Sequence, residues 1–298
     1  MFANFLPAQV TQIQEKPAIL LAQNIKRELI KTQLNEQAIA TAYVRQGNGK
    51  PPILLLHGFD SSVLEFRYIL PLLAAHRETW AIDLLGFGFT QRLPSIDYNP
   101  NTIKIHLYAA WRTLIKQPVV LVGTSMGGAT AIDFALTYPE TVEKLIIINS
   151  VGFSGDFPIG KLLFPPLDFL AVEYWRQRKL QALFWSSLNQ SSSIVDAIRC
   201  AALHLEMPHW NQALLDFMKS GGYGDIADRV GKVTQPTLIL WGDRDDTLAS
   251  GDAVKFQRAI ANSQLVWLKD CGHVPQLEQP EVVANRILEF LYFCGGSG

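Results

Sequence analysis

The stretch Val119-Val120-Leu121-Val122-Gly123-Thr124-Ser125-Met126-Gly127-Gly128 decides the fold that this chain is expected to adopt. Its apolar first half predicts a buried strand, and its second half, the pattern Gly-x-Ser-x-Gly, leads into a helix-forming segment. A strand that turns this sharply into a helix holds Ser125 at the tip of the turn, on strained backbone. Small residues are needed beside it so that the strand and the helix can approach each other. Ser125 is therefore a candidate nucleophile, and the rest of the chain must supply a base, an acid and an oxyanion site.

Length and composition are typical of a globular protein. The 298 residues are 48% hydrophobic and 18% charged, which is enough for one large α/β domain with an insertion. The formal net charge of -1 gives no electrostatic reason to expect binding to nucleic acid. No stretch is long and apolar enough to span a bilayer, and we expect no signal peptide. Cys200, Cys271 and Cys294 lie far apart without metal spacing, so we expect reduced thiols in a reducing compartment.

Strands and helices are predicted to alternate along most of the chain. Residues 25–34 and 38–46 alternate apolar and polar side chains, as in an opening β-hairpin. The pattern Ser62-x-x-Glu65 is typical of a capping box, for a helix that continues to about Ala74. The spacing of the later elements suits right-handed parallel crossovers. Further strands are expected at 53–56, 79–84, 119–124, 145–148, 236–241 and 265–268, and further helices at 102–116, at 126–137, from 251 and at 280–293.

The alternation stops after Asn149 and resumes at Pro236. From about 152 to 224 the sequence is aromatic and irregular, with several prolines. We interpret this segment as an inserted, largely helical cap. The chain is then divided into an N-terminal extension (1–24), a core (25–151 and 225–294), the cap (152–224) and a flexible tail (295–298).

His273 is the expected base. It follows the last predicted strand, so it lies at the same carboxyl edge of the sheet as Ser125. His57, directly after the strand at 53–56, is the main competitor, and we interpret it as a structural histidine that braces the oxyanion loop. Core or surface roles are expected for the other histidines, which are His76, His106, His204 and His209.

The acid is expected to follow the strand at 236–241. The strand at 145–148 ends in Asn-Ser and offers no carboxylate, whereas residues 241–246 read Trp-Gly-Asp-Arg-Asp-Asp. Gly-x-x-Asp spacing selects Asp245, which would hold the histidine in the right tautomer and stabilise the imidazolium. Asp246 is the second candidate, and Asp243 is interpreted as a turn former.

Two backbone N–H groups are expected to form the oxyanion site. Met126 follows the nucleophile at a helix N-terminus, and Phe59 lies in the loop after the strand at 53–56. Gly86-Phe87-Gly88 is interpreted as a tight turn, because a dinucleotide site would need a third glycine and a downstream acid. No Cys/His cluster indicates a metal, and no cofactor is expected.

Together these motifs resemble the α/β-hydrolase superfamily over about residues 25–293. The likeness is carried by His57-Gly58-Phe59, the turn at Ser125, Gly242-x-x-Asp245, and the pattern Gly-His-x-Pro-x-x-Glu-x-Pro at 272–280. It implies an α/β-hydrolase fold, with a mostly parallel eight-stranded sheet flanked by helices. It also implies a catalytic triad of Ser125, His273 and Asp245.

A narrower likeness points to the substrate. Residues 56–62 and 78–86, and in the cap 204–210 and 216–223, resemble the chlorophyll dephytylases, thylakoid-associated esterases that cut phytol from chlorophyll. The cap segments matter most, because caps vary with substrate. The resemblance implies a serine esterase acting on chlorophyll or another hydrophobic ester. Substrate contacts are expected from Phe59, Phe153, Met207, Trp210 and Phe217.

A phytyl ester must be taken from a membrane or a carrier protein. Each buried methylene is worth ~0.8 kcal/mol, so an isoprenoid tail of about twenty carbons is essentially never free in water. Apolar and aromatic residues crowd 157–175, cations follow at 176–179, and then come Phe184 and Trp185. This mixture suits an interfacial segment, so we expect a cytoplasmic protein in peripheral contact with the thylakoid membrane. The alternative is that the same residues pack on the core or form a dimer contact.

Other functions are compatible with the same fold. A lipase-like or small-ester carboxylesterase, or a hydrolase of carbon–carbon bonds, would use the same residues on another substrate. A non-catalytic ligand receptor would use the fold alone, because fold does not imply function, and the complete triad argues against it. Haloalkane dehalogenases and epoxide hydrolases use an aspartate nucleophile, which Ser125 disfavours.

Overall fold

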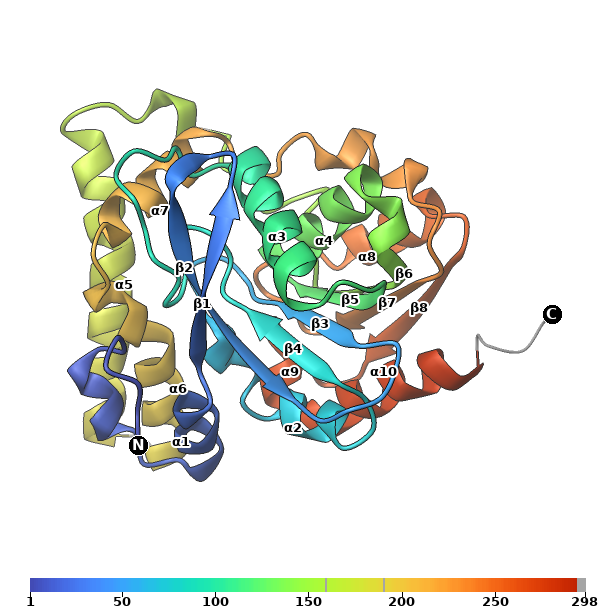
Figure 1. The fold of residues 1–298 in the computed structure, drawn as a ribbon, viewed down its shortest axis with the longest axis horizontal. Coiled ribbons are helices and arrows are strands. Elements are labelled where there is room, and N and C mark those ends of the chain that lie inside the picture. Colours follow the sequence, from blue (N-terminus) through green and yellow to red (C-terminus); the bar gives the residue numbers. More distant parts are fainter. Residues whose placement is uncertain (159, 190, 294–298) are drawn as a thin grey trace.

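A computed structural model describes residues 1–158, 160–189 and 191–293, and the predicted tail at 295–298 lies outside them. The described residues form an eight-stranded sheet with helices on both faces (Figure 1). The strands are β1 (Lys26–Thr32), β2 (Asn35–Gln46), β3 (Ile53–Leu56), β4 (Thr79–Ile82), β5 (Val119–Thr124), β6 (Val142–Ile148), β7 (Thr237–Gly242) and β8 (Ser263–Leu268).

The helices fall into three groups along the chain. One, α1 (Lys16–Gln23), belongs to the N-terminal extension. The helices of the core are α2 (Ile69–Ala74), α3 (Pro100–Leu114), α4 (Met126–Thr137), α8 (Gly251–Ala259), α9 (Pro275–Glu278) and α10 (Pro280–Phe293). The helices between β6 and β7 are α5 (Leu167–Asn189), α6 (Ser192–Ala202) and α7 (Trp210–Lys219).

The order of the strands confirms the predicted, mostly parallel sheet. It runs β1-β2-β4-β3-β5-β6-β7-β8. β2 is antiparallel to both of its neighbours, and every pair from β4–β3 to β7–β8 is parallel. β5 is buried along its whole length, as expected for a strand covered on both faces. β6 begins at Val142, three residues earlier than predicted, because the exposed Glu143 interrupts its apolar pattern.

Each face of the sheet has its own hydrophobic core. One core joins the sheet to α3, α4 and α8, through residues such as Leu107, Ile132 and Phe256. The opposite core joins it to α1, α2 and α10, through residues such as Leu70 and Ile287. Figure 1 shows α3, α4 and α8 above the sheet and α2, α9 and α10 below it. The strand ends that carry chemistry are therefore held in place by packing on both sides.

The segment after Ser62 differs from the capping box that the sequence predicts. Ser62 does cap a turn, because its Oγ accepts from Leu64 N, but that turn is the short 3-10 helix Val63–Phe66. The carboxylate of Glu65 points away from it and accepts from Gly58 N at 3.1 Å. The following helix, α2, starts only at Ile69. Donors from other segments, such as Gly58 N, compete successfully with the N–H of its own turn for the Glu65 carboxylate, and a local pattern does not reveal this.

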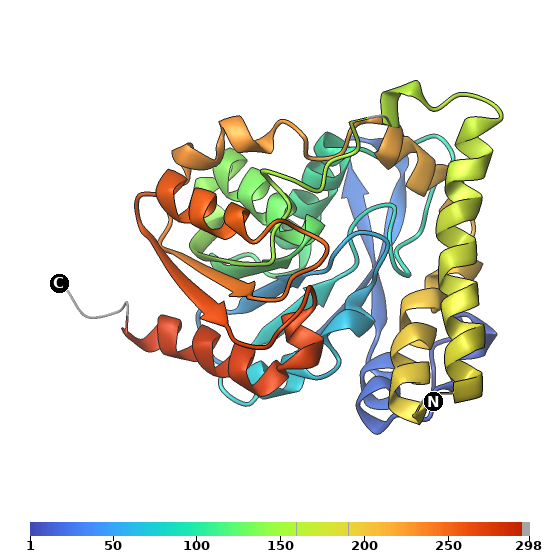
Figure 2. The ribbon, with the colours of Figure 1, turned by 180° about the vertical axis from the view of Figure 1, so that it is seen from behind.

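The insertion between β6 and β7 carries three helices, and the N-terminal extension packs against one of them. The amides of Gln14 and Glu15 both donate to Asp196 of α6, at 2.6 and 2.5 Å. Glu15 in turn forms an ion pair with Arg67 of the core, 3.0 Å away. Figure 2 shows α5 as a long helix along the outer side of the molecule, beside α6. The extension therefore ties the base of the insertion to the core.

The turn between β5 and α4 requires glycine on both sides of Ser125. Ser125 has φ 51° and ψ -119°, a strained conformation for a residue with a side chain. A Cβ on Gly123 would lie 2.1 Å from the carbonyl oxygen of Gly127, and one on Gly127 would lie 2.2 Å from that of Leu56. Helix α4 thus rests directly against the ends of β5 and β3.

We expect Gly127→Ala to destabilise the protein, because its Cβ would collide with rigid backbone. Overpacking of this kind typically costs ~1–3 kcal/mol, measurable as a lower midpoint of urea unfolding. Gly251→Ala is the matched control, since a Cβ there meets nothing within 4 Å. A Gly127→Ala protein as stable as the Gly251→Ala protein would contradict the close approach of α4 and β3.

Candidate active site

Ser125, His273 and Asp245 lie in one chain of hydrogen bonds at the carboxyl edge of the sheet. His273 Nε2 is 3.2 Å from Ser125 Oγ, and its Nδ1 is 3.0 Å from each oxygen of Asp245. The side chain of Asp245 is fully buried, whereas that of His273 is 18% exposed. A neutral His273 with its proton on Nδ1 can accept the serine proton on Nε2. The structure therefore brings together the three residues that the sequence predicts as a triad.

Asp245 is held by its own loop as well as by the histidine. Its Oδ1 accepts from the amides of Thr247 and Leu248, at 2.8 and 3.0 Å. Burial by itself raises the pKa of Asp245, but the hydrogen bonds from His273 and from these amides outweigh it and lower the pKa below its usual range. The carboxylate is therefore ionised, as the orientation of an imidazolium requires.

The other two acids of this loop point elsewhere. Asp246 is exposed and contacts the hydroxyl of Thr247. Asp243 accepts from Cys271 N at 3.3 Å, which ties the two loops together in the way expected of a turn residue. The geometry therefore favours Asp245 over Asp246 as the acid that orients His273.

Asn149 is a supporting residue that the sequence analysis did not identify. It directly follows β6 and lies in the left-handed region, with φ 42°. Its amide nitrogen donates to Asp245 Oδ2 at 2.8 Å and to the carbonyl of Gly272 at 2.9 Å, while its oxygen accepts from Gly242 N. One side chain thus ties together the end of β6, the acid loop and the histidine loop. Its position in the sequence could have indicated this role, because it directly follows a strand whose end offers no carboxylate.

His57 fixes the orientation of the peptide unit between Gly58 and Phe59. Burial lowers the pKa of His57 to about 3, so the ring is neutral. Its Nε2 accepts from Leu84 N at 3.1 Å, which leaves the proton on Nδ1, and Nδ1 donates to the Gly58 carbonyl at 2.8 Å. With this carbonyl held on one side, the Phe59 N–H of the same planar unit points the opposite way. The bracing role expected for His57 has this physical basis.

Glu65 also binds the loop after β3. Its Oε2 accepts from Gly58 N, and its Oε1 accepts from Gln276 Nε2 at 2.8 Å and from the hydroxyl of Thr124. Met126, the second expected donor, opens α4, where backbone N–H groups have no intrahelical acceptor. A Cβ on Gly58 would lie 3.4 Å from that of Ser125, so the loop and the nucleophile are in contact. The arrangement suits a pair of donors aimed at an oxyanion.

Two cavities meet at Ser125. The smaller, of about 180 Å³, lies between the sheet and the insertion. The larger, of about 360 Å³, contains more polar groups, among them Glu65, Arg178, Lys179 and Gln276. Phe59, Ser125, Trp175 and Thr247 line both. The remaining side of the smaller cavity is apolar, and it is formed by Met126, Val151, Gly155, Phe157, Phe217, Tyr223 and Leu248.

The residues expected to contact substrate divide into two groups. Phe59 and Phe217 line the smaller cavity, with ring centroids 5.6 Å apart. Phe153 packs edge-on against Phe256 of α8, and Met207 belongs to the core on the opposite face of the sheet. Trp210 packs within the insertion and donates its Nε1–H to Asp60 at 2.8 Å. The structure does not bring these last three to the walls of either cavity.

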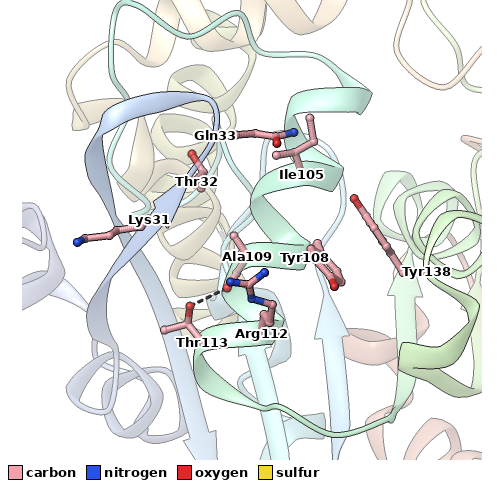
Figure 3. Close-up of a pocket in the computed structure, with 9 residues that line it drawn as sticks. All are labelled: Lys31, Thr32, Gln33, Ile105, Tyr108, Ala109, Arg112, Thr113 and Tyr138. Atoms are coloured by element: carbon pink, nitrogen blue, oxygen red, sulfur yellow. Dashed lines mark hydrogen bonds between the residues drawn. The ribbon is translucent and has the colours of Figure 1, made fainter.

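A separate hollow lies away from the triad. Figure 3 shows it between the β1–β2 hairpin and α3, where Tyr108 and Tyr138 stack with their ring centroids 4.1 Å apart. Its walls contain no member of the triad, and Lys31 points away from it. Within the described ranges, no group of His, Cys, Asp or Glu side chains is arranged to hold a metal ion.

We expect Asp245→Asn to slow ester hydrolysis by a factor of ~10⁴, because an amide would favour the wrong histidine tautomer. Asp246→Asn is the control, since that neighbour makes no contact with His273, and it should keep the wild-type kcat. The measurement is kcat for a soluble chromogenic ester, with thermal unfolding of both variants. Equal losses in the two variants would remove Asp245 from the triad.

Comparisons of the sequence and of the structure with known proteins agree on one family. The alpha/beta hydrolase family profile matches residues 53–286. The chain is 35% identical to the alpha/beta hydrolase domain-containing protein VTE7 of Arabidopsis thaliana, over 97% of this chain and 90% of that protein. It is 28% identical to monoacylglycerol lipase ABHD6 of Homo sapiens, over 81% of this chain and 75% of that protein. A solved thermophilic esterase from Thermogutta terrifontis superposes with a TM-score of 0.75 at 26% identity, over 89% of this chain and 98% of that one. The chain therefore belongs to the alpha/beta hydrolase family and is an esterase- or lipase-like hydrolase.

Proposed function

We propose that this hydrolase releases phytol from chlorophyll, or the alcohol from a similarly hydrophobic ester. The observation that carries the proposal is the pair of cavities at Ser125, one of them small and lined by apolar and aromatic side chains. The segments of the insertion that resemble chlorophyll dephytylases support the choice of alcohol. Two of these segments supply Phe217 and Tyr223 to the apolar walls and Trp210 to the hydrogen bond with Asp60.

The reaction follows from the geometry. Ser125 Oγ attacks the ester carbonyl carbon while His273 Nε2 takes its proton, and the oxygen of the tetrahedral intermediate accepts from the Phe59 and Met126 N–H groups. When the ester C–O bond breaks, the imidazolium gives its proton to the departing alkoxide, and the alcohol leaves. A water molecule then attacks the acyl-enzyme with His273 as base, which releases the acid and restores Ser125.

In this proposal each of the two cavities receives one half of the ester. An isoprenoid chain gains ~0.8 kcal/mol for each methylene removed from water, so it favours the apolar cavity beneath the insertion. The larger cavity has polar groups from both core and insertion, and it suits the more polar acyl half. Trp175, which lines both, stands between the two halves.

Chlorophyll in detergent micelles is the direct substrate test. We expect the wild type to produce chlorophyllide and phytol, and Ser125→Ala to lose at least ~10³-fold in kcat. Monoacylglycerols, a soluble nitrophenyl ester and a carbon–carbon substrate complete the panel. Chlorophyll left intact while a short ester is hydrolysed would replace the proposal with a small-ester or lipase-like activity. Undiminished turnover by Ser125→Ala would exclude the triad mechanism.

We also propose that α5 is the surface through which the protein contacts the thylakoid membrane from the cytoplasmic side. At 100° per residue, the exposed apolar side chains of α5 fall within an arc of about 160°. They are Leu167, Phe169, Leu170, Tyr174, Leu180, Phe184, Trp185 and Leu188. Val172, Trp175 and Lys179 lie on the opposite side of the helix. Val172 packs within the insertion, and Trp175 and Lys179 line the larger cavity.

Eight exposed apolar side chains on the outer side of one helix indicate a surface for a partner. None of the described helices combines the length and the apolar character that a bilayer-spanning segment needs. The exposed Arg178 supplies a cation at the edge of this face, between it and the larger cavity. Its guanidinium carbon lies 5.4 Å from the centroid of the Trp175 ring. Aromatic side chains flanked by cations are typical of segments that lie in a membrane interface.

Replacing Phe169 and Phe184 together with serine should weaken binding to phosphatidylglycerol-containing vesicles by at least tenfold, because each buried phenyl group is worth ~1.5–3 kcal/mol. Vesicle co-sedimentation is the measurement, and hydrolysis of a soluble ester should be unchanged. Leu29→Ser is the control, because Leu29 is also exposed but lies on β1. Unchanged vesicle binding together with a smaller oligomer in the double variant would assign the face to a second copy of the chain.

A further inference from the structure

Three parts of the insertion converge on one buried carboxylate beside the oxyanion loop. Asp60 Oδ2 is 2.6 Å from Lys179 Nζ of α5. Its Oδ1 accepts from His204 Nε2 and from Trp210 Nε1, each at 2.8 Å. These partners are 119 to 150 residues away in the sequence. Asp60 is 4% exposed and His204 is fully buried, so the cluster is a desolvated link between core and insertion.

The charges of this cluster are balanced. Burial by itself raises the pKa of Asp60, but the Lys179 ammonium and His204 overcome it and hold the pKa well below its usual range. Burial, followed by the nearby Lys179 charge, lowers the pKa of His204 to about 4, so its ring is neutral and donates through Nε2. One carboxylate is thus matched by one cation and two neutral donors. Such an arrangement is stable only while all partners are in place.

Asp60 also shapes the loop that carries the Phe59 N–H. Its φ of 49° is in the left-handed region, which is uncommon for a residue with a side chain. Lys179 Nζ donates to the backbone carbonyl of Asp60 and also pairs with its carboxylate, so the insertion binds the main chain of the loop directly. The ring of Phe59 packs on Phe157 and Trp175, with centroids 5.0 and 5.4 Å away.

The oxyanion loop is therefore held from two sides. The core fixes the Gly58 end, through His57 and Glu65. The insertion fixes the Phe59–Asp60 end, through the side chain of each residue and the carbonyl of Asp60. We propose that Asp60 is a positioning residue that couples the seating of the cap to the alignment of the Phe59 N–H, so that the oxyanion site is complete only when Lys179, His204 and Trp210 are docked. The proposal rests on ester hydrolysis at Ser125 and not on which alcohol leaves.

The test separates alignment of the oxyanion donor from simple attachment of the cap. Asp60→Asn is assayed with a soluble nitrophenyl ester, and its affinity is measured for a boronic acid, which forms a tetrahedral adduct with the serine, and for an uncharged amide of the same shape. We expect kcat and boronate affinity to fall together by ~10–10²-fold, less than the 10²–10³ typical of losing a donor outright. KM and amide affinity should change less than threefold.

Asp133→Asn is the matched control. Asp133 is also a buried carboxylate with two cationic partners, Lys104 and Arg229, but it lies in α4 away from the loop. It should lower the unfolding temperature and leave kcat and boronate affinity unchanged. If Asp60→Asn does not fold, Trp210→Phe is used in its place, because it removes the Nε1–H donor and keeps an aromatic side chain. A smaller loss of kcat and boronate affinity is then expected.

Each outcome decides a separate question. Equal losses of amide and boronate affinity with an unchanged kcat would mean that Asp60 only attaches the cap, and the proposal would be wrong. Wild-type kcat in both Asp60→Asn and Trp210→Phe would also overturn it. A wild type that hydrolyses the nitrophenyl ester and not chlorophyll would revise the substrate alone and leave this test valid.

Discussion

A side chain at Gly127 would strike the carbonyl oxygens of Leu56 and His57, and the geometry of the site depends on this close approach. It seats the first turn of α4 against the end of β3, so the loop that continues from β3 lies beside the nucleophile. The strained backbone of Ser125 and the first turn of α4, which carries the Met126 N–H, thereby lie beside the loop that carries Phe59. Packing between glycine and backbone is rigid, which is what an oxyanion site needs, because donors that must reorganise during the reaction stabilise charge less well.

The second constraint is the shared edge of a parallel sheet. β5, β6 and β7 end side by side, so Ser125, Asn149 and the loop with Asp245 are neighbours although they are far apart in the chain. Asn149 uses this proximity to join three loops through one side chain. The insertion then covers the edge, and its contacts with Asp60 and Phe59 reach the same loop from the solvent side. Core and insertion each hold one half of the oxyanion loop.

The fold, and the three residues that the structure brings together at the sheet edge, could be predicted because their signals are local. Ser125 and His273 each follow an apolar strand, and the spacing after Gly242 selects Asp245. Glu65 and Asp60 could not be interpreted in this way, because their partners come from distant segments and pairing across such distances leaves no periodic trace. Phe153, Met207 and Trp210, which the sequence analysis expects at the substrate, do not line either cavity at Ser125. An aromatic or sulfur-containing side chain in an insertion looks the same in sequence whether it faces the substrate or the protein interior, and here these three are used for packing.

The central claim is that Ser125 is the activated nucleophile of this hydrolase. The most direct test is to react the native protein with a fluorophosphonate, which phosphonylates serines activated by a neighbouring base, and to locate the adduct by peptide mass spectrometry. The account predicts one adduct per chain, on the peptide that contains Ser125, and at least a hundredfold slower labelling when His273 is replaced by alanine. No adduct on the folded protein, or an adduct on another residue that forms equally fast without His273, would contradict it.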